Sequence, residues 1–418
     1  MKYYIIAGEA SGDLHGSNLV KGLLEKDPSA QIRAWGGELM RQAGAEVVKD
    51  YRENSIMGFV EVVANIGKIL GNMKECCKDI LAFNPDVVIL IDYPGFNMKI
   101  AKFAKKHGLK VFYYIAPKVW AWKERRVHKI KRYVDKLFII FPFEVEYFRK
   151  WGIKTVYRGN PLLDSVCNFS HAGESRAAFE ARTFPKRQVI CTTAAEPATA
   201  AAAMPIIAAL AGSRKMEIGF LLPRIVRTAL AMPQYRFIIA AAPSMEPEYL
   251  KKIIQKELAA AGAPAGSSQA GSNKKQSCIS HTQAGRCNIE IVYGETYAVL
   301  QQSVAAIISS GTASLEAALL KTPQVVCYGG NPISFYIAKA VVKLKYISLA
   351  NLILDKLIFK EILQNDCTPA NISAELEALI NQKTYRDAML ADYDKVHQLL
   401  GGGGASGRIA EAMIEELK

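Results

Sequence analysis

Residues 86–97 read DVVILIDYPGFN, and this stretch decides how the first half of the chain folds. Its run of consecutive apolar residues predicts a strand that is buried on both faces. Asp92 stands where this strand opens into a turn, and the chain then turns sideways at Pro94 and Gly95. A helix follows from about Asn97. A buried strand that leads directly into a helix is the repeating unit of a parallel α/β sheet.

The same alternation of strand and helix continues on both sides of this stretch. The further strands predicted in the first 165 residues are YYIIAG (3–8), KVFYYIAP (110–117), KLFIIFPFE (136–144) and KTVYRG (154–159). Strict alternation predicts a doubly wound parallel sheet. Sheets of this kind bind ligands at the carboxyl ends of their strands.

A second alternating series begins near residue 206. Its predicted strands are IIAAL (206–210), YRFIIAAAP (235–243), IEIVYG (289–294), AAIISSG (305–311) and PQVVCYG (323–329). Two similar α/β halves predict two Rossmann-like domains with an interdomain cleft. The length of 418 residues agrees, because a single hydrophobic core rarely grows beyond about 250–300 residues.

Three breaks in the pattern set the predicted domain boundaries. The first is an Ala-rich run at 194–204, the second is a surface loop or disordered insertion at 262–287, and the third is the glycine run at 401–407. The predicted organisation is therefore a first domain at 1–165, an irregular linker at 166–205, a second domain at 206–385 and terminal helices at 386–418, which cross back to the first domain in chains of the two-domain type.

The charge balance favours an anionic partner. Lys and Arg number 53 against 39 Asp and Glu, which leaves a formal net charge of +14. Nucleic acid, anionic lipid and a phosphorylated substrate all suit such a surplus. No apolar run reaches the about 18–20 residues of a spanning helix, and the first residues read as a strand instead of a signal peptide. Eight scattered cysteines without a C-x-x-C pair predict reduced thiols in a cytoplasmic protein.

The end of the first strand carries AGEASGDLHG (7–16), a candidate anion pocket. Small residues let backbone N–H groups approach a ligand, and the following helix offers its positive N-terminus. The motif is not the dinucleotide fingerprint G-x-G-x-x-G. The alternative is that Ser11 or Asp13 simply caps the helix. His15 alone is more often structural than catalytic.

Asp92 is the candidate general base. A carboxylate at a strand end accepts a proton from a substrate hydroxyl when the two groups lie within hydrogen-bond reach. From the spacing alone, a cap on the next helix is an equal alternative for Asp92.

Two segments predict contact with a membrane surface. Residues 118–136 hold eight Lys or Arg interleaved with Trp120, Trp122 and Tyr133. This mixture suits nucleic acid or lipid headgroups. The segment IMGFVEVVANIGKILGNMK (56–74) favours the membrane, because it has more apolar residues than one buried helix stripe needs. The alternatives are a solvated helix face for the first segment and a core helix for the second.

Two predicted phosphate-binding turns lie in the second half. In the first, Gly212, Ser213 and Arg214 stand between a strand and a helix. A backbone turn together with a guanidinium suits a diphosphate, which arginine can bind with two parallel hydrogen bonds.

The second turn lies in ISSGTASLEAALL (308–320). Its candidate donors to phosphate oxygens are Ser310, Gly311 and Thr312. Glu316 lies one helical turn farther in and can accept from ribose hydroxyls. A capped helix start is the alternative. Two such turns in one domain predict a bound nucleoside diphosphate.

Together these motifs resemble the lipid-A-disaccharide synthase family, whose members are glycosyltransferases of the GT-B fold. The resemblance runs from residue 3 to about residue 367. It rests on stretches in the family's order, namely AGEASGDLHG (7–16), IMGFVEV (56–62), IDYPGFN (91–97), APKVWAWKERRVHKI (116–130), FPFE (141–144), GSRKMEI (212–218), SSGTASLE (309–316) and YISLANLI (346–353).

The resemblance implies transfer of 2,3-diacylglucosamine from UDP-2,3-diacylglucosamine to 2,3-diacylglucosamine 1-phosphate, or lipid X. The products are a β-1,6 disaccharide and UDP, formed with inversion and without a metal or other cofactor. Asp92 would deprotonate the acceptor's 6-hydroxyl, and Arg214 would hold the diphosphate and offset charge on the leaving group. The implied acceptor side, in the first domain, is Glu9, Ser11, Gly12, His15 and Met57. The implied donor side, in the second domain, is Gly212, Ser213, Arg214, Ser310, Gly311, Thr312, Glu316 and Asn351.

The resemblance also implies a peripheral place on the inner membrane, whose anionic phospholipids the basic segment would meet. It implies no nucleic-acid partner and leaves a homodimer open. Two rivals share the fold. A polyprenyl-linked N-acetylglucosaminyl transferase should carry a Gly-rich H-x-x-P loop, which is not found. A UDP-sugar 2-epimerase should hold several carboxylates and no membrane-seeking segment. A nonenzymatic nucleotide- or nucleic-acid-binding module fits the charge but leaves Asp92 and the two turns unexplained.

Overall fold

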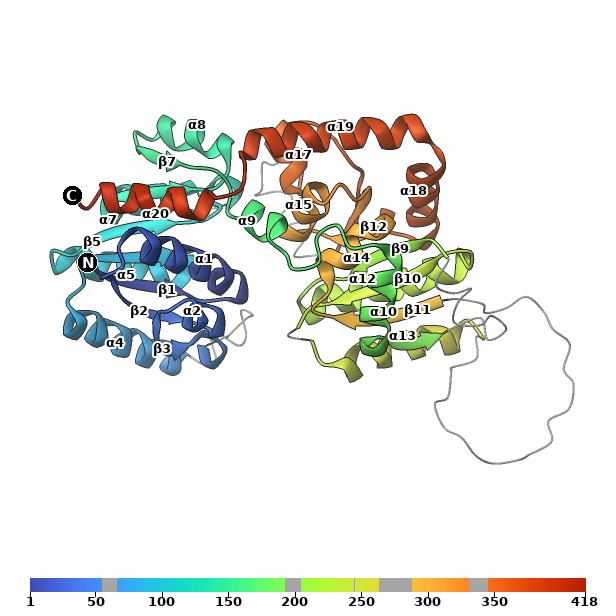
Figure 1. The fold of residues 1–418 in the computed structure, drawn as a ribbon, viewed down its shortest axis with the longest axis horizontal. Coiled ribbons are helices and arrows are strands. Elements are labelled where there is room, and N and C mark those ends of the chain that lie inside the picture. The colour runs from blue at the N-terminus through green and yellow to red at the C-terminus, as the bar shows by residue number, and fades with distance from the viewer. Residues whose placement is uncertain (55–65, 123, 192–203, 244, 263–287, 331–344) are drawn as a thin grey trace, which may run out of the picture. The chain divides into compact units, whose positions relative to one another are not determined.

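The computed structural model describes the chain in two compact units. One comprises Met1–Cys167 together with Gln398–Lys418, and the other comprises Asn168–His397. Both chain ends lie in the first unit (Figure 1). The described residues are 1–54, 66–122, 124–191, 204–243, 245–262, 288–330 and 345–418.

The first unit is built on a seven-stranded sheet with the order β3-β2-β1-β4-β5-β6-β7. Every neighbouring pair in it is parallel, as the alternation predicts. The order reverses between β1 and β4, and such a switch point is where open α/β sheets bind ligands. The strands are β1 (Lys2–Ala7), β2 (Gln31–Gly36), β3 (Glu46–Asp50), β4 (Val87–Ile91), β5 (Lys110–Tyr114), β6 (Lys136–Ile139) and β7 (Thr155–Tyr157).

Helices cover the sheet of the first unit and connect its strands. The C-terminal helix α20 (Ala405–Glu415) packs on α1 (Figure 1). Gly22 permits this approach, because a Cβ atom there would lie 3.1 Å from the Cβ of Ala410. The other helices are α1 (Ala10–Lys26), α2 (Glu38–Gln42), α4 (Ile66–Phe83), α5 (Pro94–Lys106), α6 (Val119–Trp122), α7 (Val127–Tyr133), α8 (Pro142–Lys150) and α9 (Leu162–Cys167), with the short turns η1 (Tyr51–Asn54) and η2 (Glu124–Arg126).

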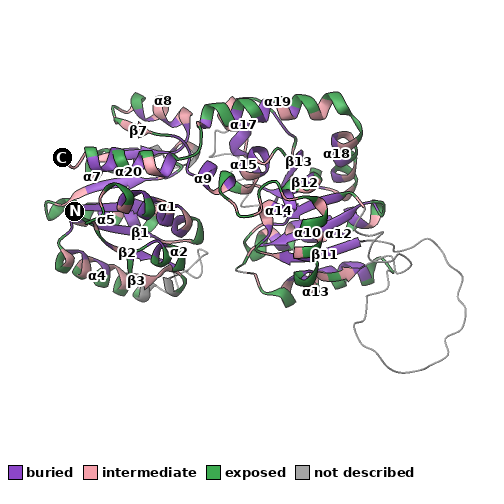
Figure 2. Cartoon of the chain, in the orientation of Figure 1, coloured by how far each residue is buried: buried purple, intermediate pink, exposed green. Residues whose placement is uncertain are grey.

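The buried strands form the core that positions the switch point. All five residues of β4 are fully buried, and the inner strands of both units are coloured mainly as buried in Figure 2, while the helices show exposed outer faces. Burying each such aliphatic side chain contributes about 1.5–3 kcal/mol. The carboxyl end of β4 is therefore fixed by its own packing before any ligand arrives.

The second unit repeats the plan with the order β14-β13-β12-β9-β10-β11-β8. Its strands run parallel except for β8, which pairs antiparallel with β11 at the edge. The strands are β8 (Gln188–Cys191), β9 (Ile206–Leu210), β10 (Arg236–Ala241), β11 (Asn288–Tyr293), β12 (Ser303–Ser309), β13 (Gln324–Tyr328) and β14 (Glu361–Leu363). The helices are α10 (Arg176–Thr183), α12 (Lys215–Ala231), α13 (Pro247–Ala260), α14 (Thr296–Gln301), α15 (Thr312–Leu319), α17 (Leu349–Leu354), α18 (Pro369–Asn381) and α19 (Lys383–Leu400), with η3 (Phe184–Lys186) and η4 (Gln364–Asp366).

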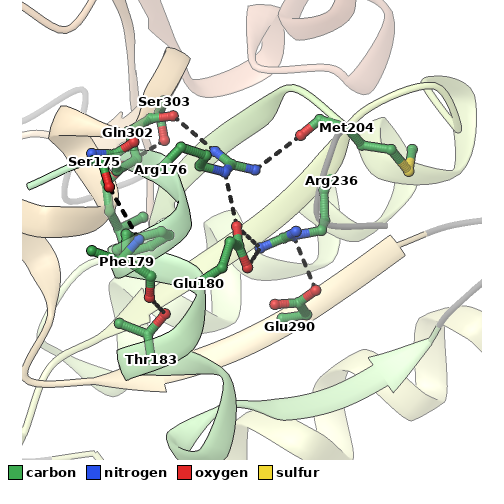
Figure 3. Close-up of polar contacts among 12 residues, drawn as sticks. Ser175, Arg176, Phe179, Glu180, Thr183, Met204, Arg236, Glu290, Gln302 and Ser303 are labelled. Atoms are coloured by element: carbon green, nitrogen blue, oxygen red, sulfur yellow. Dashed lines mark hydrogen bonds and ion pairs between the residues drawn. The ribbon is translucent and has the colours of Figure 1, made fainter. Parts of the chain in front are cut away.

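Part of the segment expected to be an irregular linker, 166–205, is regular structure. Helix α10 and strand β8 lie in it and belong to the second unit, while residues 192–203 lie outside the described part of the chain. Helix α10 buries Phe179 and Thr183, and it also takes part in a buried ion network. Glu180 on α10 forms an ion pair with Arg236 of β10, with 2.8 Å between Oε1 of Glu180 and Nη2 of Arg236 (Figure 3). Charged residues carry no hydrophobic periodicity, so the pattern did not reveal them.

Candidate active site

Asp92 lies directly after β4, at the switch point of the first sheet. Its backbone N–H continues the ladder by donating to the carbonyl of Tyr114, at 3.2 Å. Asp92 and Tyr93 then both take the left-handed conformation, with φ of 42° and 46°, before Pro94 opens α5. Two consecutive non-glycine residues in this region cost energy, and such strain gathers at functional sites.

The surroundings of Asp92 tune its acidity. Burial, and to a smaller extent the nearby carboxylate of Glu9, raise the pKa of Asp92 to about 6 against the Lys118 ammonium and the backbone N–H of Tyr93. A carboxylic acid of this pKa is largely ionised at neutral pH and still takes up a proton readily. Those are the properties of a general base.

Glu9 and its neighbours stand at the start of α1. Glu9 is the residue before the first turn of α1, and its carbonyl accepts from the N–H of Asp13 at 2.9 Å. Ser11 is exposed and Gly12 is buried. A side chain at position 12 would be crowded, because its Cβ would lie 3.1 Å from the Cβ of Ala7. The structure therefore brings Glu9 into electrostatic reach of Asp92 and leaves Ser11 at the surface.

Asp13 and His15 point into the first unit instead. The Asp13 carboxylate caps α2 by accepting from the N–H groups of Gly37 and Met40, at 2.8 and 3.1 Å. His15 is 7% exposed, and burial lowers its pKa to about 4 although Asp164 acts in the opposite direction. His15 is therefore a buried residue of the first unit, and the place on the acceptor side that the resemblance implies for it stays a prediction. Met57 lies outside the described residues.

An apolar pocket adjoins Asp92 at the carboxyl ends of β1, β2 and β3. It is open to solvent, and the space between its walls, open solvent included, amounts to about 400 Å³. Phe96 stacks on Trp35 and on Tyr93, with ring centroids 5.8 and 5.6 Å apart. Gly8 is required here, because a Cβ atom would lie 2.4 Å from the Tyr93 ring. The lining residues are Ile6, Ala7, Gly8, Trp35, Lys49, Tyr51, Ile69, Asn72, Tyr93 and Phe96.

Glu144 is a buried carboxyl group in the stretch FPFE (141–144), and the sequence alone suggested no role for it. It accepts from the indole N–H of Trp120 at 3.1 Å and from the backbone N–H groups of Ile140 and Phe141. Burial raises the pKa of Glu144 to about 7, against these hydrogen bonds and the Lys118 ammonium. Lys118 thus acts electrostatically on both Glu144 and Asp92. The signal was available, since Glu144 stands at the third position of a helix start.

The first predicted phosphate turn follows β9 in the second unit. Gly212 has a φ of 107°, which favours glycine, and Arg214 is the residue before α12. The Arg214 side chain is 59% exposed, with Nη1 3.7 Å from Oε1 of Glu217. Glu217 also accepts from the N–H of Ser213 at 3.2 Å. Glu217 was missed, although its place in the first helical turn could have shown that a carboxylate reaches back to this turn.

The second predicted turn follows β12, the strand that pairs with β9. The two turns adjoin, since a Cβ on Gly212 would lie 3.3 Å from Oγ of Ser309. Ser310 is half-buried and Thr312 is exposed, at the start of α15. Gly311 stands between them with a φ of 134°.

Glu316 has a partner that sequence spacing did not reveal. The hydroxyl of Tyr297, on α14, donates to Oε1 of Glu316 at 3.1 Å. Burial raises the pKa of Glu316, and the hydrogen bond from Tyr297 opposes this. The carboxylate is thereby oriented from a separate helix.

Asn351 is fully buried on α17, close to the chain that leads into β14. Its amide donates to the carbonyl of Phe359 and to Glu361, and its oxygen accepts from the N–H of Ile358 at 2.9 Å. The side chain is thus satisfied inside the second unit. The donor contact that the resemblance implies for Asn351 stays a prediction.

The basic segment 118–136 forms α6, η2, α7 and the start of β6. Within the ranges that the structure describes, no helix combines the length and the apolar character that crossing a bilayer requires. Of the apolar segment 56–74, residues 56–65 lie outside those ranges and the rest begins α4.

The chain forms two α/β units, each built on a largely parallel sheet with candidate ligand-binding turns after its strands. This is the architecture of the GT-B class, and solved structures agree. The UDP-GlcNAc 2-epimerase from Neisseria meningitidis matches with a TM-score of 0.65 at 14% identity, over 99% of this chain and 100% of that one. A glycosyltransferase from Rickettsia africae matches with a TM-score of 0.55 at 13% identity, over 100% of this chain and 98% of that one. At these identities the likeness shows the fold alone.

The family follows from comparison of sequences. The family model described as lipid-A-disaccharide synthetase matches residues 3–279 and 269–405. The lipid-A-disaccharide synthase of Geobacter metallireducens is 34% identical over 99% of this chain and 96% of its own, and that of Myxococcus xanthus is 31% identical over 99% and 97%. The chain belongs to the lipid-A-disaccharide synthase family, and full-length homology assigns it that family's activity, a glycosyltransferase step of lipid A biosynthesis.

Proposed function

We propose that the chain transfers 2,3-diacylglucosamine from UDP-2,3-diacylglucosamine to lipid X with inversion. The acceptor's 6-oxygen attacks C1 of the donor sugar and gives its proton to Asp92. The bond from C1 to the β-phosphate oxygen breaks, and UDP leaves with the electron pair. The product is the β-1,6 disaccharide 1-phosphate.

The observation that carries the proposal is the state of Asp92. Its strained position at the end of β4 and its pKa of about 6 both suit a group that takes a proton during turnover. The adjoining pocket, with Trp35 and Phe96 in its wall, offers an apolar surface for the apolar part of an acylated sugar. Glu9 and Ser11 stand at the same edge for hydroxyl contacts.

The donor site is proposed in the second unit, where the turns after β9 and β12 adjoin. Ser310, Gly311 and Thr312 offer donors at a helix start, and the largely exposed Arg214 offers a guanidinium. Arg214 would neutralise charge that develops on UDP as it leaves. Glu316, oriented by Tyr297, would accept from the ribose.

We place the protein on the cytoplasmic face of the inner membrane. The support is the basic segment 118–136 and the substrates themselves, whose acyl chains stay in the bilayer. Sedimentation with vesicles of anionic phospholipid, compared with neutral vesicles, tests this placement. Sedimentation equilibrium of the same preparation tests for a homodimer.

Asp92→Asn tests the base. Incubation with UDP-2,3-diacylglucosamine and lipid X, followed by mass spectrometry of disaccharide and UDP, should show turnover reduced by a factor of about 10²–10⁴ with donor binding retained. Asp86→Asn is the matched control, because Asp86 lies at the other end of β4 and accepts only from the N–H of Lys2 among the described side-chain bonds. Turnover by Asp92→Asn equal to that of the control would refute the assignment.

Arg214→Ala tests the donor site. It should weaken UDP binding in calorimetry and also slow turnover. Arg227→Ala is the control, because Arg227 lies on the same helix with a side chain 58% exposed, close to the 59% of Arg214. Equal effects of the two substitutions would exclude a specific role for Arg214. Conversion of UDP-N-acetylglucosamine to its 2-epimer, without disaccharide, would favour an epimerase.

A further inference from the structure

The backbone strain at Asp92 and Tyr93 needs a structural cause. Each residue has a positive φ, a conformation that costs a non-glycine residue about 1–2 kcal/mol. Neither residue is a glycine that would adopt it freely. Strain of this kind persists only where the surrounding structure over-determines the conformation. The groups that hold the 92–93 peptide are therefore informative.

Two side chains hold the carbonyl oxygen of Asp92. The hydroxyl of Tyr113, on the neighbouring strand β5, donates to it at 2.5 Å. The amide of Asn97, on α5, donates to it at 2.9 Å and also to the carbonyl of Ile91 at 3.1 Å. Both side chains are fully buried. Two elements on different sides of the turn thus fix one peptide group.

We propose that Tyr113 and Asn97 are positioning residues that hold the Asp92 peptide in its left-handed conformation and so aim the Asp92 carboxylate. The proposal rests on the proposed function, in which Asp92 is the base. The Asp92 N–H is held by the carbonyl of Tyr114, and the Asp92 carbonyl is held by Tyr113 and Asn97. Fixing the peptide groups on both sides of the Asp92 Cα fixes φ and ψ of Asp92, and with them the direction in which its side chain leaves the backbone.

The protonation state of Tyr113 suits a hydroxyl that must donate a hydrogen bond to the Asp92 carbonyl. Burial raises the pKa of Tyr113 well above its ordinary value, and the charge of Asp92 raises it further. The hydroxyl therefore keeps its proton across the range in which Asp92 ionises, and it donates throughout. A carbonyl that lost both donors inside the protein would carry the cost of an unsatisfied polar group, about 1–3 kcal/mol. The turn would then relax to another conformation.

The experiment compares Tyr113→Phe with Tyr114→Phe. The two tyrosines are adjacent on β5 and both fully buried, but the Tyr114 hydroxyl lies near Ser406 and Asp164 instead of the Asp92 carbonyl. With UDP-2,3-diacylglucosamine and lipid X, Tyr113→Phe should lower kcat about 10- to 100-fold with KM for the donor little changed, because small misplacement of a reacting group is costly. The acidic limb of its pH–rate profile should move to lower pH as the carboxylate relaxes toward solvent. Tyr114→Phe should change neither quantity.

Asn97→Ala is the second variant, with Asn160→Ala as its control. Asn160 is also buried in the first unit and donates to the carbonyl of Ile140 at 3.0 Å, away from Asp92. Both substitutions should lower the thermal stability, but only Asn97→Ala should shift the pH profile. Equal profiles in each variant and its control would overturn the proposal.

A titration separates this proposal from the assignment of the base. The ¹³C shift of the Asp92 carboxyl group, identified by its loss in Asp92→Asn, is followed against pH in the wild type and in Tyr113→Phe. A changed titration in Tyr113→Phe supports positioning even if Asp92→Asn retains turnover, in which case only the proposed function fails. An unchanged titration, with Asp92→Asn inactive, refutes the positioning role and leaves the base in place.

Discussion

The carboxylate of Glu9, at the start of α1, acts electrostatically on Asp92 at the end of β4. Burial is the main cause that raises the pKa of Asp92 to about 6, and the like charge of Glu9 adds to it. The two residues lie on neighbouring strand ends, since β1 and β4 are paired. The acidity of the candidate base is thus set partly by a residue of a different motif.

Glu9→Gln should therefore extend activity to lower pH. Without the like charge, the pKa of Asp92 falls, and the acidic limb of kcat moves down by up to about one pH unit. Activity across pH 4–8 gives the limb directly. Glu25→Gln, on the exposed last turns of α1, should leave the limb in place. A limb unmoved by Glu9→Gln would show that Glu9 does not act on the group that titrates.

Asp92→Asn should stabilise the folded protein at neutral pH. The folded-state pKa is raised from 3.8 to about 6, so the native state takes up a proton more readily than the unfolded chain. The ionised carboxylate thus lowers stability as pH rises from about 4 to about 6, and this loss is complete above that window. Removing the charge should raise the free energy of unfolding at pH 7.5 by about 1–3 kcal/mol, with little gain at pH 4. Hydrogen exchange of β4 at both pH values measures the difference, and a gain that did not depend on pH would contradict this account.

Asp13→Ala should destabilise the first unit. The Asp13 carboxylate is 3% exposed and accepts from the N–H groups of Gly37, Leu39 and Met40. Its removal leaves buried donors at the start of α2 without an acceptor, so we expect a loss of about 1–3 kcal/mol, measured by urea denaturation. Glu38→Ala on the same helix removes an exposed ion pair with Arg41 and an exposed hydrogen bond from Gln42, and should cost less than about 1 kcal/mol. Equal losses would mean that the cap contributes nothing specific.

Much of the frame was predictable from sequence, because it depends on local patterns. The run 87–91 predicted a buried strand, and the structure confirms a parallel sheet with Asp92 at its carboxyl end. The turns at 212–214 and 310–312 were placed correctly after strands for the same reason. Hydrophobic periodicity and turn residues carry this information within a few positions of the chain.

The rest depends on contacts between distant residues. Nothing near Asp92 in the sequence shows that Tyr113, on the next strand, fixes its carbonyl. Asp13 caps a helix 24 or more residues away instead of its own, and His15 is buried, where the charge of Asp164 acts on it. Helix α10 was missed because its anchoring residues are charged. Spacing rules cover one helical turn or one strand step, and these contacts exceed both.

Glu180→Gln should lower the concentration of urea at which the second unit unfolds. The Glu180 carboxylate lies 2.8 Å from Arg236 and 2.7 Å from Arg187, two guanidinium groups with almost no exposed side-chain surface (Figure 3 shows the first of these contacts). The carboxylate of Glu290 also forms ion pairs with Arg187 and Arg236. A neutral amide leaves one carboxylate for two buried cations, and breaking a buried pair in this way costs about 3–5 kcal/mol. Hydrogen exchange of β10 in urea reports the loss in this unit. Glu248→Gln removes a carboxylate that is 83% exposed and should cost less than about 1 kcal/mol. If Glu180→Gln proved as mild as Glu248→Gln, the network would not be what attaches α10 to the sheet, and the apolar contacts of α10 would have to account for it.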